Sequence, residues 1–231
     1  MPVAIITGAS RGLGRALAEA LAARGWDLVL DARGAGPLRE AAEAVEGRGV
    51  RVAALPGDVT DPGHRAGLVA AARRLGGADL VVSNASALGA EPLVRLGELP
   101  LDGLRRALEV NVVAALGLVQ EALPLLRRSP AGTVIAVSSD AAVEAYGTWG
   151  GYGASKAALD QLAAVLGAEE PALRVWAVDP GDMATELYAA AVPGDDGPRP
   201  APAEVVPAFL RLLDERPASG RYAAPALAVG R

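Results

Sequence analysis

The sequence predicts one α/β domain over residues 1–231, a doubly wound parallel β-sheet of about seven strands with helices on both faces. Two observations support this fold class. Short, almost continuously apolar runs alternate along the chain with longer Ala-, Leu-, Arg- and Glu-rich stretches at helical spacing. Such strands are buried on both faces, as in a parallel sheet covered by helices, and the repeated alternation implies right-handed crossovers.

The apolar runs define the expected strands, of which the last is the weakest: Val3–Thr7, Leu28–Asp31, Val50–Ala54, Leu80–Ser83, Thr133–Ser138, Val175–Val178 and Arg221–Ala224. Helical spacing predicts helices that begin near Gly12, Pro37, Pro62, Leu101, Tyr152 and Ala203. The Pro-, Gly- and Asp-rich segment 192–203 is either a surface loop or part of a substrate-covering loop around 182–203.

Composition excludes several function classes. The net charge is −5 and Arg is spread along the chain, which argues against a nucleic-acid surface. Cysteine is absent and His64 is the single histidine, so thiolate catalysis is excluded and a metal site is not expected. No apolar run approaches the ~20 residues of a membrane span, and the N-terminal run is too short for a signal peptide. We therefore expect a cytoplasmic protein without a membrane partner.

Residues 7–14, TGASRGLG, directly follow the first expected strand and allow two chemistries. G-x-S-x-G could be a nucleophile elbow around Ser10, or the glycines could form a loop that holds a pyrophosphate at a helix N-terminus. The elbow needs a histidine late in the chain, whereas His64 lies in DPGHR and is expected to be a solvated first-turn side chain. The phosphate-binding loop is the interpretation that remains.

A second motif supports redox chemistry. Tyr152 and Lys156 are four residues apart, so they share one face of a helix. A nearby ammonium favours phenolate over phenol, and we expect it to lower the pKa of Tyr152 from ~10 toward neutrality. The tyrosine could then act as a general acid or base toward a carbonyl or an alcohol.

Together, these motifs resemble the short-chain dehydrogenase/reductase family over essentially the whole chain, which implies a Rossmann-like fold. The family's T-G-x-x-x-G-x-G matches Thr7, Gly8, Gly12 and Gly14, and its Y-x-x-x-K matches Tyr152 and Lys156. The resemblance further implies a catalytic Ser139, with Ser138 as its neighbour, and Asn111 as the fourth catalytic residue. As asparagine is a poor mid-helix residue, its side chain is expected to have a specific partner.

The resemblance also implies a dinucleotide site. Its expected residues are Gly8, Ser10, Arg11, Gly12, Leu13, Gly14, Arg33, Asp58, Val59, Asn84, Ala85, Tyr152, Lys156, Pro180, Gly181 and Thr185. Asp58 would contact the adenine and Thr185 the nicotinamide carboxamide. One departure is Ser86, which replaces the glycine of the family's N-N-A-G and is expected to crowd the ribose side of the cofactor.

The end of the second strand bears on cofactor preference. Ala32 occupies the position at which NAD-preferring members carry an acid for the ribose. Arg33 follows and can pair with a 2′-phosphate, while Asp31 should point to the other face of the strand. We expect NADP(H) to be preferred and NAD(H) to be possible; a one-residue shift of register would reverse this.

The implied reaction is reduction of a small-molecule carbonyl, or oxidation of the corresponding alcohol. Tyr152 would protonate the oxygen and Ser139 hold it, Lys156 would bind the ribose, and Asn111 would order a relay water. Tyr146, Trp149, Met183, Leu187 and Tyr188 are expected either near the substrate or in the core or a subunit interface, and the second role is favoured for Tyr188. A homodimer or homotetramer is implied by the resemblance. The alternative is a non-catalytic, dinucleotide-sensing or scaffold member of the fold.

Overall fold

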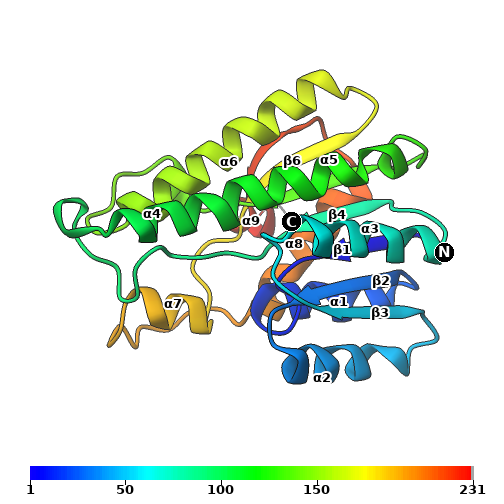
Figure 1. Cartoon of the computed structure of the whole chain (residues 1–231), viewed down its shortest axis with the longest axis horizontal. Helices are drawn as coiled ribbons and strands as arrows, with labels where there is room; N and C mark the ends of the chain where they lie inside the picture. Colours follow the sequence, from blue (N-terminus) through cyan, green and yellow to red (C-terminus); the bar gives the residue numbers. More distant parts are fainter. Residues whose placement is uncertain (230–231) are drawn as a thin grey trace.

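The computed structural model describes residues 1–229 and contains one seven-stranded parallel sheet in the order β3-β2-β1-β4-β5-β6-β7 (Figure 1). The strands are β1 (Val3–Ile6), β2 (Asp27–Ala32), β3 (Val52–Pro56), β4 (Leu80–Ser83), β5 (Thr133–Val137), β6 (Arg174–Asp179) and β7 (Gly220–Ala223). The α-helices are α1 (Gly12–Ala23), α2 (Ala35–Glu46), α3 (Pro62–Leu75), α4 (Leu101–Leu108), α5 (Ala114–Leu126), α6 (Gly150–Glu169), α7 (Glu186–Ala191), α8 (Pro202–Glu215) and α9 (Ala224–Val229). All seven expected strands and the doubly wound fold class are confirmed.

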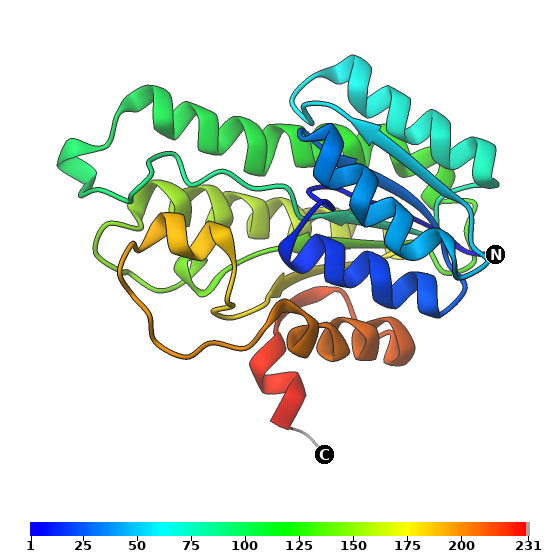
Figure 2. The ribbon, with the colours of Figure 1, turned by 90° about the horizontal axis from the view of Figure 1, so that it is seen from below.

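Side chains that alternate along β1 explain the two layers. Ala4 and Ile6 pack into the core beneath α1, α2 and α8, whereas Val3 and Ile5 pack beneath α3, α5 and α6. Figure 2 shows α1 and α8 side by side on the first of these faces. Because β1 and β4 are neighbours, the strand order reverses between them, and their carboxyl ends form the crevice in which such sheets bind ligands.

The segment after β6 differs from the expected loop. Glu186–Ala191 form the short helix α7, with Thr185 as its N-cap, and residues 192–201 then return to α8 without regular structure. Figure 1 shows α7 apart from the layered body of the molecule. The helix was missed because its apolar pattern covers less than two turns, although Thr185-Glu186 is a helix-start signal.

A continuous helical stretch joins α4 to α5 through the π-helical turn η2 (Glu109–Val113). Its length and hydropathy would suffice to cross a membrane, and its most apolar window is only 39% buried. Within this molecule it packs against α3 and α6 as a layer of the α/β fold. A π turn places one extra residue in a helix and often marks a functional site, and Asn111 lies within it.

Candidate active site

The loop between β1 and α1 is shaped by its glycines. Gly8 has a φ of +64°, a left-handed conformation that side chains disfavour. A Cβ on Gly14 would lie 2.4 Å from the Gly8 carbonyl oxygen, so only glycine permits this close approach. Asn84 secures the loop from β4, because its Nδ2 donates to the Thr7 and Gly8 carbonyls at 2.9 and 3.1 Å. The Asn84 side chain therefore holds the loop.

Thr7 is a structural residue that sequence reasoning did not place in the site. Its hydroxyl accepts the amides of Asn84 and Ala85, both at 3.0 Å, and donates to the Val82 carbonyl at 3.3 Å. These bonds join the carboxyl ends of β1 and β4 at the point where the strand order reverses. The threonine of the T-G motif was the available signal.

The N-terminus of α1 fits a dinucleotide phosphate. Arg11 is the N-cap residue but its side chain does not cap the helix, so the first-turn amides are left for an anion. Gly12 has a φ of +56°, and a Cβ there would meet only the Thr185 methyl, at 3.7 Å. The Leu13 side chain packs in the core, so only its backbone amide can contact a phosphate. Thr185 is thus brought to the loop, where Glu186 of α7 also pairs with Arg11.

The expectation that His64 is solvated is wrong. Its Nε2 lies 2.6 Å from Asp31 Oδ1, and the two side chains are 10% and 2% exposed. Burial raises the pKa of Asp31, and the hydrogen bond from His64 and the amide of Gly8 oppose that rise. Gly57 leaves room for the imidazole, since a Cβ there would lie 2.3 Å from His64 Nδ1. The error arose because α3 turns its first-turn histidine toward β2.

The register at the end of β2 is as expected. Asp31 is committed to His64 on one face, while Ala32 is small and nearly buried on the other. Arg33 follows the strand and is exposed. The carboxylate of Asp31 is therefore not directed to the position at which a ribose would be held.

Asp58 and Val59 follow β3. Burial favours a raised pKa for Asp58, but hydrogen bonds from Thr60 and the Arg106 ion pair at 2.9 Å lower it to about 2. Its Oδ1 accepts the Thr60 amide and hydroxyl at 2.9 and 2.8 Å. Val59 packs with Val110 and, like Ala85, belongs to the apolar cluster at the start of α5. The Asp58 carboxylate is thus fixed beside the crevice.

Tyr152 and Lys156 lie on one face of α6 and are both nearly fully buried. The Lys156 ammonium lies 5.4 Å from the centroid of the Tyr152 ring, but it donates to the Val137 carbonyl at 2.7 Å. Burial raises the pKa of Tyr152 above its ordinary value and lowers that of Lys156 to about 8. The expected lowering of the tyrosine pKa is therefore wrong for this structure, because desolvation by burial is the largest influence and the nearby carboxylates of Asp179 and Asp140 act in the same direction.

Ser139 begins the turn η3 (Asp140–Ala142) after β5. Its hydroxyl accepts the Ala141 amide at 3.2 Å and donates to Asp140 Oδ1 at 3.1 Å. Ser138 also reaches the pocket but is almost fully buried. The turn thereby presents the Ser139 hydroxyl to the same pocket as Tyr152.

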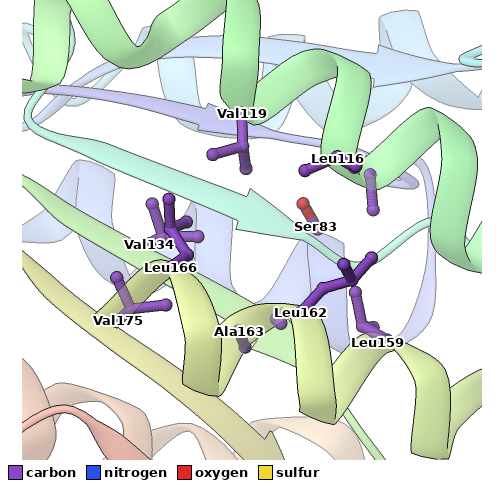
Figure 3. Close-up of a pocket in the computed structure, with 11 residues that line it drawn as sticks. Ser83, Leu116, Val119, Val134, Leu159, Leu162, Ala163, Leu166 and Val175 are labelled. Atoms are coloured by element: carbon purple, nitrogen blue, oxygen red, sulfur yellow. The ribbon is translucent and has the colours of Figure 1, made fainter. Parts of the chain in front are cut away.

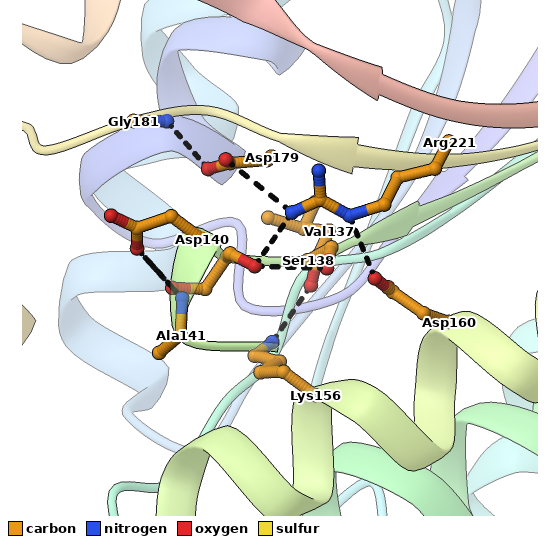
Figure 4. Close-up of polar contacts among 10 residues, drawn as sticks. Val137, Ser138, Asp140, Ala141, Lys156, Asp160, Asp179, Gly181 and Arg221 are labelled. Carbon is orange, nitrogen blue, oxygen red and sulfur yellow. Dashed lines mark hydrogen bonds and ion pairs between the residues drawn. The ribbon is translucent and has the colours of Figure 1, made fainter. Parts of the chain in front are cut away.

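Arg221 of β7 contacts the turn that contains Ser139, and the sequence analysis did not predict this role. Its guanidinium donates to the Ser139 carbonyl at 2.9 Å and pairs with Asp160 at 3.0 Å and Asp179 at 3.5 Å (Figure 4). Burial raises the pKa of Asp179, whereas the amide of Gly181 and Arg221 act against that rise. One cation thus joins the carboxyl ends of β5 and β6 to helix α6.

Asn111 has the specific partners that its mid-helix position predicted. Its Oδ1 accepts the Ala87 amide at 2.8 Å and the Ser86 hydroxyl at 3.2 Å. Its Nδ2 donates to the Ala87 carbonyl at 2.9 Å and to Ser155 Oγ at 2.8 Å. The carboxamide has no further bond to offer, so its expected role in ordering a water is wrong for the side chain. Ser86 turns toward Asn111, which also corrects the expected crowding of the ribose side.

The pocket above Ser139 and Tyr152 is walled by side chains from α6 and the segment after β6. Trp149, Met183 and Leu187 line it as expected, together with Pro180, Gly181 and Thr185. Tyr188 lines it too, against the expectation, and the Arg199 guanidinium stacks 3.9 Å from its ring centroid. Tyr146 does not line the pocket, because it is 47% exposed and its hydroxyl donates to Asp140.

Comparison with known proteins agrees with this geometry. The short chain dehydrogenase family model matches residues 2–195. An uncharacterized oxidoreductase of Saccharomyces cerevisiae is 35% identical over 188 residues, 80% of this chain and 72% of the relative. An alcohol dehydrogenase from Thermococcus sibiricus, solved with 5-hydroxy-NADP, is 29% identical with a TM-score of 0.86, covering 96% and 95% of the two chains. A short chain dehydrogenase from Shigella flexneri, solved with NADP, is 28% identical with a TM-score of 0.90, covering 97% of both. The chain belongs to the short-chain dehydrogenase/reductase family of oxidoreductases.

Proposed function

We propose that this protein is an NADPH-dependent carbonyl reductase that also oxidises the corresponding secondary alcohol. The observation that carries the proposal is the position of Ser139 and Tyr152 in one pocket, beside a glycine loop whose helix N-terminus is free for a phosphate. A module that only senses dinucleotides has no need of a buried tyrosine and lysine at this edge of the sheet.

Three features support NADPH over NADH. Asp31 is occupied by His64 and is nearly fully buried, so its carboxylate is not offered to a ribose hydroxyl. Arg33 is exposed at the end of β2, and its guanidinium can pair bidentately with a 2′-phosphate. The Thermococcus and Shigella relatives were solved with NADP-type ligands. NAD(H) would remain a weaker ligand through the contacts that both dinucleotides share.

Each residue of the site then has a separate role in the reduction of the carbonyl. The nicotinamide, when bound, supplies the hydride that adds to the carbonyl carbon. The Ser139 hydroxyl turns from Asp140 Oδ1 to donate a hydrogen bond to the carbonyl oxygen, and Tyr152 gives that oxygen a proton. The Lys156 ammonium, near the tyrosine ring, favours the phenolate that forms and can bind the ribose hydroxyls. Thr185 lies beside Gly12, where it can meet the nicotinamide end of the cofactor.

The substrate pocket indicates the kind of substrate, and the groove between α5 and α6 indicates contact with a second copy of the chain. Trp149 and Tyr188 favour a substrate with an apolar or ring-shaped body. An apolar groove between α5 and α6 contains the buried, unpartnered hydroxyl of Ser83 (Figure 3). Leu116 and Leu162 line this groove, and we propose that a second copy of the chain covers it in a homodimer or homotetramer.

The test of the proposed function is oxidation of NADPH by the purified protein with a panel of ketones and quinones. Turnover of at least one carbonyl is expected. Tight binding of NADPH without turnover of any carbonyl would instead favour the non-catalytic, dinucleotide-sensing alternative. Sedimentation velocity on the same preparation should show a dimer or tetramer, and a monomer at micromolar concentration would contradict the proposed interface.

A further inference from the structure

The Tyr188 ring is held from outside the substrate pocket by the segment that follows α7. The Arg199 guanidinium stacks 3.9 Å from the ring centroid, and its Nη2 donates to the Tyr188 hydroxyl at 2.8 Å. That hydroxyl donates in turn to Asp195 Oδ2 at 3.0 Å, and the same carboxylate pairs with Arg199. Tyr188 lines the pocket whereas Arg199 does not, so the three side chains form a clamp whose inner surface is the ring.

The Arg199 side chain is itself fixed in place. Only 13% of it is exposed, and its Nη1 donates to the carbonyls of Asp195 and Gly197 at 3.1 and 2.7 Å. The Asp195 carboxylate also accepts the Gly197 amide at 3.2 Å. Because the loop closes around the guanidinium, the Tyr188 ring is ordered before any substrate binds, and binding does not have to order it.

Trp149 continues this aromatic surface to the proposed proton donor. Its ring centroid lies 6.5 Å from that of Tyr188 and 5.6 Å from that of Tyr152, and the rings of the second pair meet edge to face at 67°. All three rings line the same pocket. A carbonyl held at Tyr152 therefore has its attached group against aromatic side chains. Such side chains favour another aromatic ring, in stacked or edge-to-face contact, beyond the gain from burying apolar area.

The charges in the pocket restrict the charge of that attached group. Among the described residues that line the pocket, the charged ones are the carboxylates Asp140, Asp179 and Asp182. Arg221 pairs with Asp179 at 3.5 Å. Burial raises the pKa of Asp182, and Asp140 adds to the rise while Arg199 opposes it. A substrate carboxylate would bring a further like charge into this lining, so the pocket disfavours anions.

We propose that Tyr188, clamped by Arg199, is a specificity-determining residue that selects carbonyl substrates bearing an uncharged aromatic ring. This inference rests on the proposed function and narrows its substrate class. The ring of the substrate packs on Trp149 and Tyr188, and its carbonyl oxygen reaches Ser139 and Tyr152. Aliphatic carbonyls lose the ring contact, and carbonyls that carry a carboxylate meet the acidic lining.

The test compares the full-length wild type with Tyr188→Leu, which keeps apolar volume without the ring. NADPH oxidation is measured with methyl benzoylformate and methyl cyclohexylglyoxylate, which share the ketone and the ester and differ in whether the ring is aromatic. In Tyr188→Leu, the kcat/KM ratio of the aromatic to the saturated substrate should fall about three- to tenfold, as expected for a lost ring–ring contact. The intrinsic reactivities of the two ketones cancel in this comparison, and an unchanged ratio would overturn the inference.

Two further variants separate the ring from its clamp. Tyr188→Phe keeps the ring and loses both hydroxyl bonds, so most of the wild-type ratio should remain. Arg199→Met removes the stacked guanidinium, and the ratio should fall by a smaller factor than in Tyr188→Leu. The matched control is Tyr146→Leu, because Tyr146 is exposed and does not line the pocket. Its ratio should equal that of the wild type, and a fall as large as in Tyr188→Leu would contradict the role given to the clamped ring.

The requirement for an uncharged substrate is tested with benzoylformate, the carboxylate that matches the methyl ester. Asp182→Asn removes one negative charge from the pocket lining. The kcat/KM for benzoylformate relative to its methyl ester should then rise about threefold, while the KM for NADPH stays the same. No rise in Asp182→Asn would contradict the exclusion of anions by the lining.

Failure of the proposed function can be told apart from failure of this inference. If the wild type turns over no carbonyl, the proposed function fails, and the inference is then tested by isothermal titration calorimetry of the protein with NADP⁺ present. Methyl benzoylformate should bind more tightly than methyl cyclohexylglyoxylate, and Tyr188→Leu should reduce the difference. Equal affinities of the wild type for the two esters would overturn the inference.

Discussion

Two regions meet at the site, and they are built in different ways. The glycine loop is held by main-chain groups: the Gly8 carbonyl approaches Gly14 directly, and Asn84 bonds the carbonyls of Thr7 and Gly8. The segment after β6 is held in part by side chains, such as the pair of Arg199 with Asp195 and the bond from the Tyr188 hydroxyl to Asp195. A site with one part preset by its backbone and one part adjustable suits a constant cofactor and a variable substrate.

The largest effect is expected at Tyr152, which lies on α6 in the pocket that the segment after β6 lines. Tyr152→Phe removes the proton donor and keeps the ring, so kcat should fall by a factor of about 10² to 10⁴. NADPH binding, followed by nicotinamide fluorescence, should be nearly unchanged. Tyr146→Phe is the matched control, because Tyr146 is exposed and does not line the pocket. Turnover by Tyr152→Phe at the wild-type rate would remove Tyr152 from the mechanism.

The next largest effect on NADPH binding is expected from a change in the glycine loop alone. Gly14→Ala places a Cβ 2.4 Å from the Gly8 carbonyl oxygen, so the loop must open and NADPH binding should be lost. We expect a loss of about 1–3 kcal/mol in the free energy of unfolding from the overpacking. Gly36→Ala is the control, since a Cβ there meets nothing within 4 Å. Equal NADPH affinity in Gly14→Ala and the wild type would show that the loop does not hold the cofactor.

His64→Ala tests the buried pair beneath that loop. Removing the imidazole leaves the Asp31 carboxylate with the Gly8 amide as its remaining hydrogen-bond donor, and breaking a buried pair in this way costs about 3 kcal/mol. The pKa of Asp31 is raised in the folded protein, so its contribution to stability is greatest below pH 3.8 and is lost as pH rises through the folded value. Without His64 the pKa should rise further.

The loss of stability in His64→Ala should therefore be small in acid and grow toward neutral pH, as measured by urea unfolding. The double variant Asp31→Asn/His64→Ala buries a neutral amide and should recover part of the loss at neutral pH. A loss that is independent of pH would mean that packing, and not the carboxylate, explains the effect.

The same difference between the regions explains what the sequence could predict. The strands follow from apolar runs, and the loop and the Tyr152–Lys156 pair follow from local spacing, because each depends on neighbours along the chain. The contact of His64 with Asp31, and that of Ser86 with Asn111, join residues 33 and 25 positions apart. Both depend on how one element packs on another, which no local pattern carries. The pKa of Tyr152 was misjudged for the same reason, since spacing shows the ammonium but not the burial.

The smallest effect is expected at the exposed end of β2, where cofactor choice depends on one side chain. Arg33→Ala should weaken NADPH binding about tenfold, as expected for the loss of a charge-assisted contact in solvent. NADH binding should not change, because NADH has no 2′-phosphate. Arg39→Ala, an exposed arginine in α2, is the matched control and should alter neither affinity.

The measurement that tests the account most directly is a paired titration of the wild-type protein with NADPH and NADH, followed by nicotinamide fluorescence. The account predicts that NADPH binds at least about tenfold more tightly, through the paired charge of Arg33 and the 2′-phosphate. Equal or tighter binding of NADH would contradict it, because a carboxylate would then have to reach the ribose from a strand whose Asp31 is held by His64. Binding of neither would contradict the assignment of the glycine loop itself.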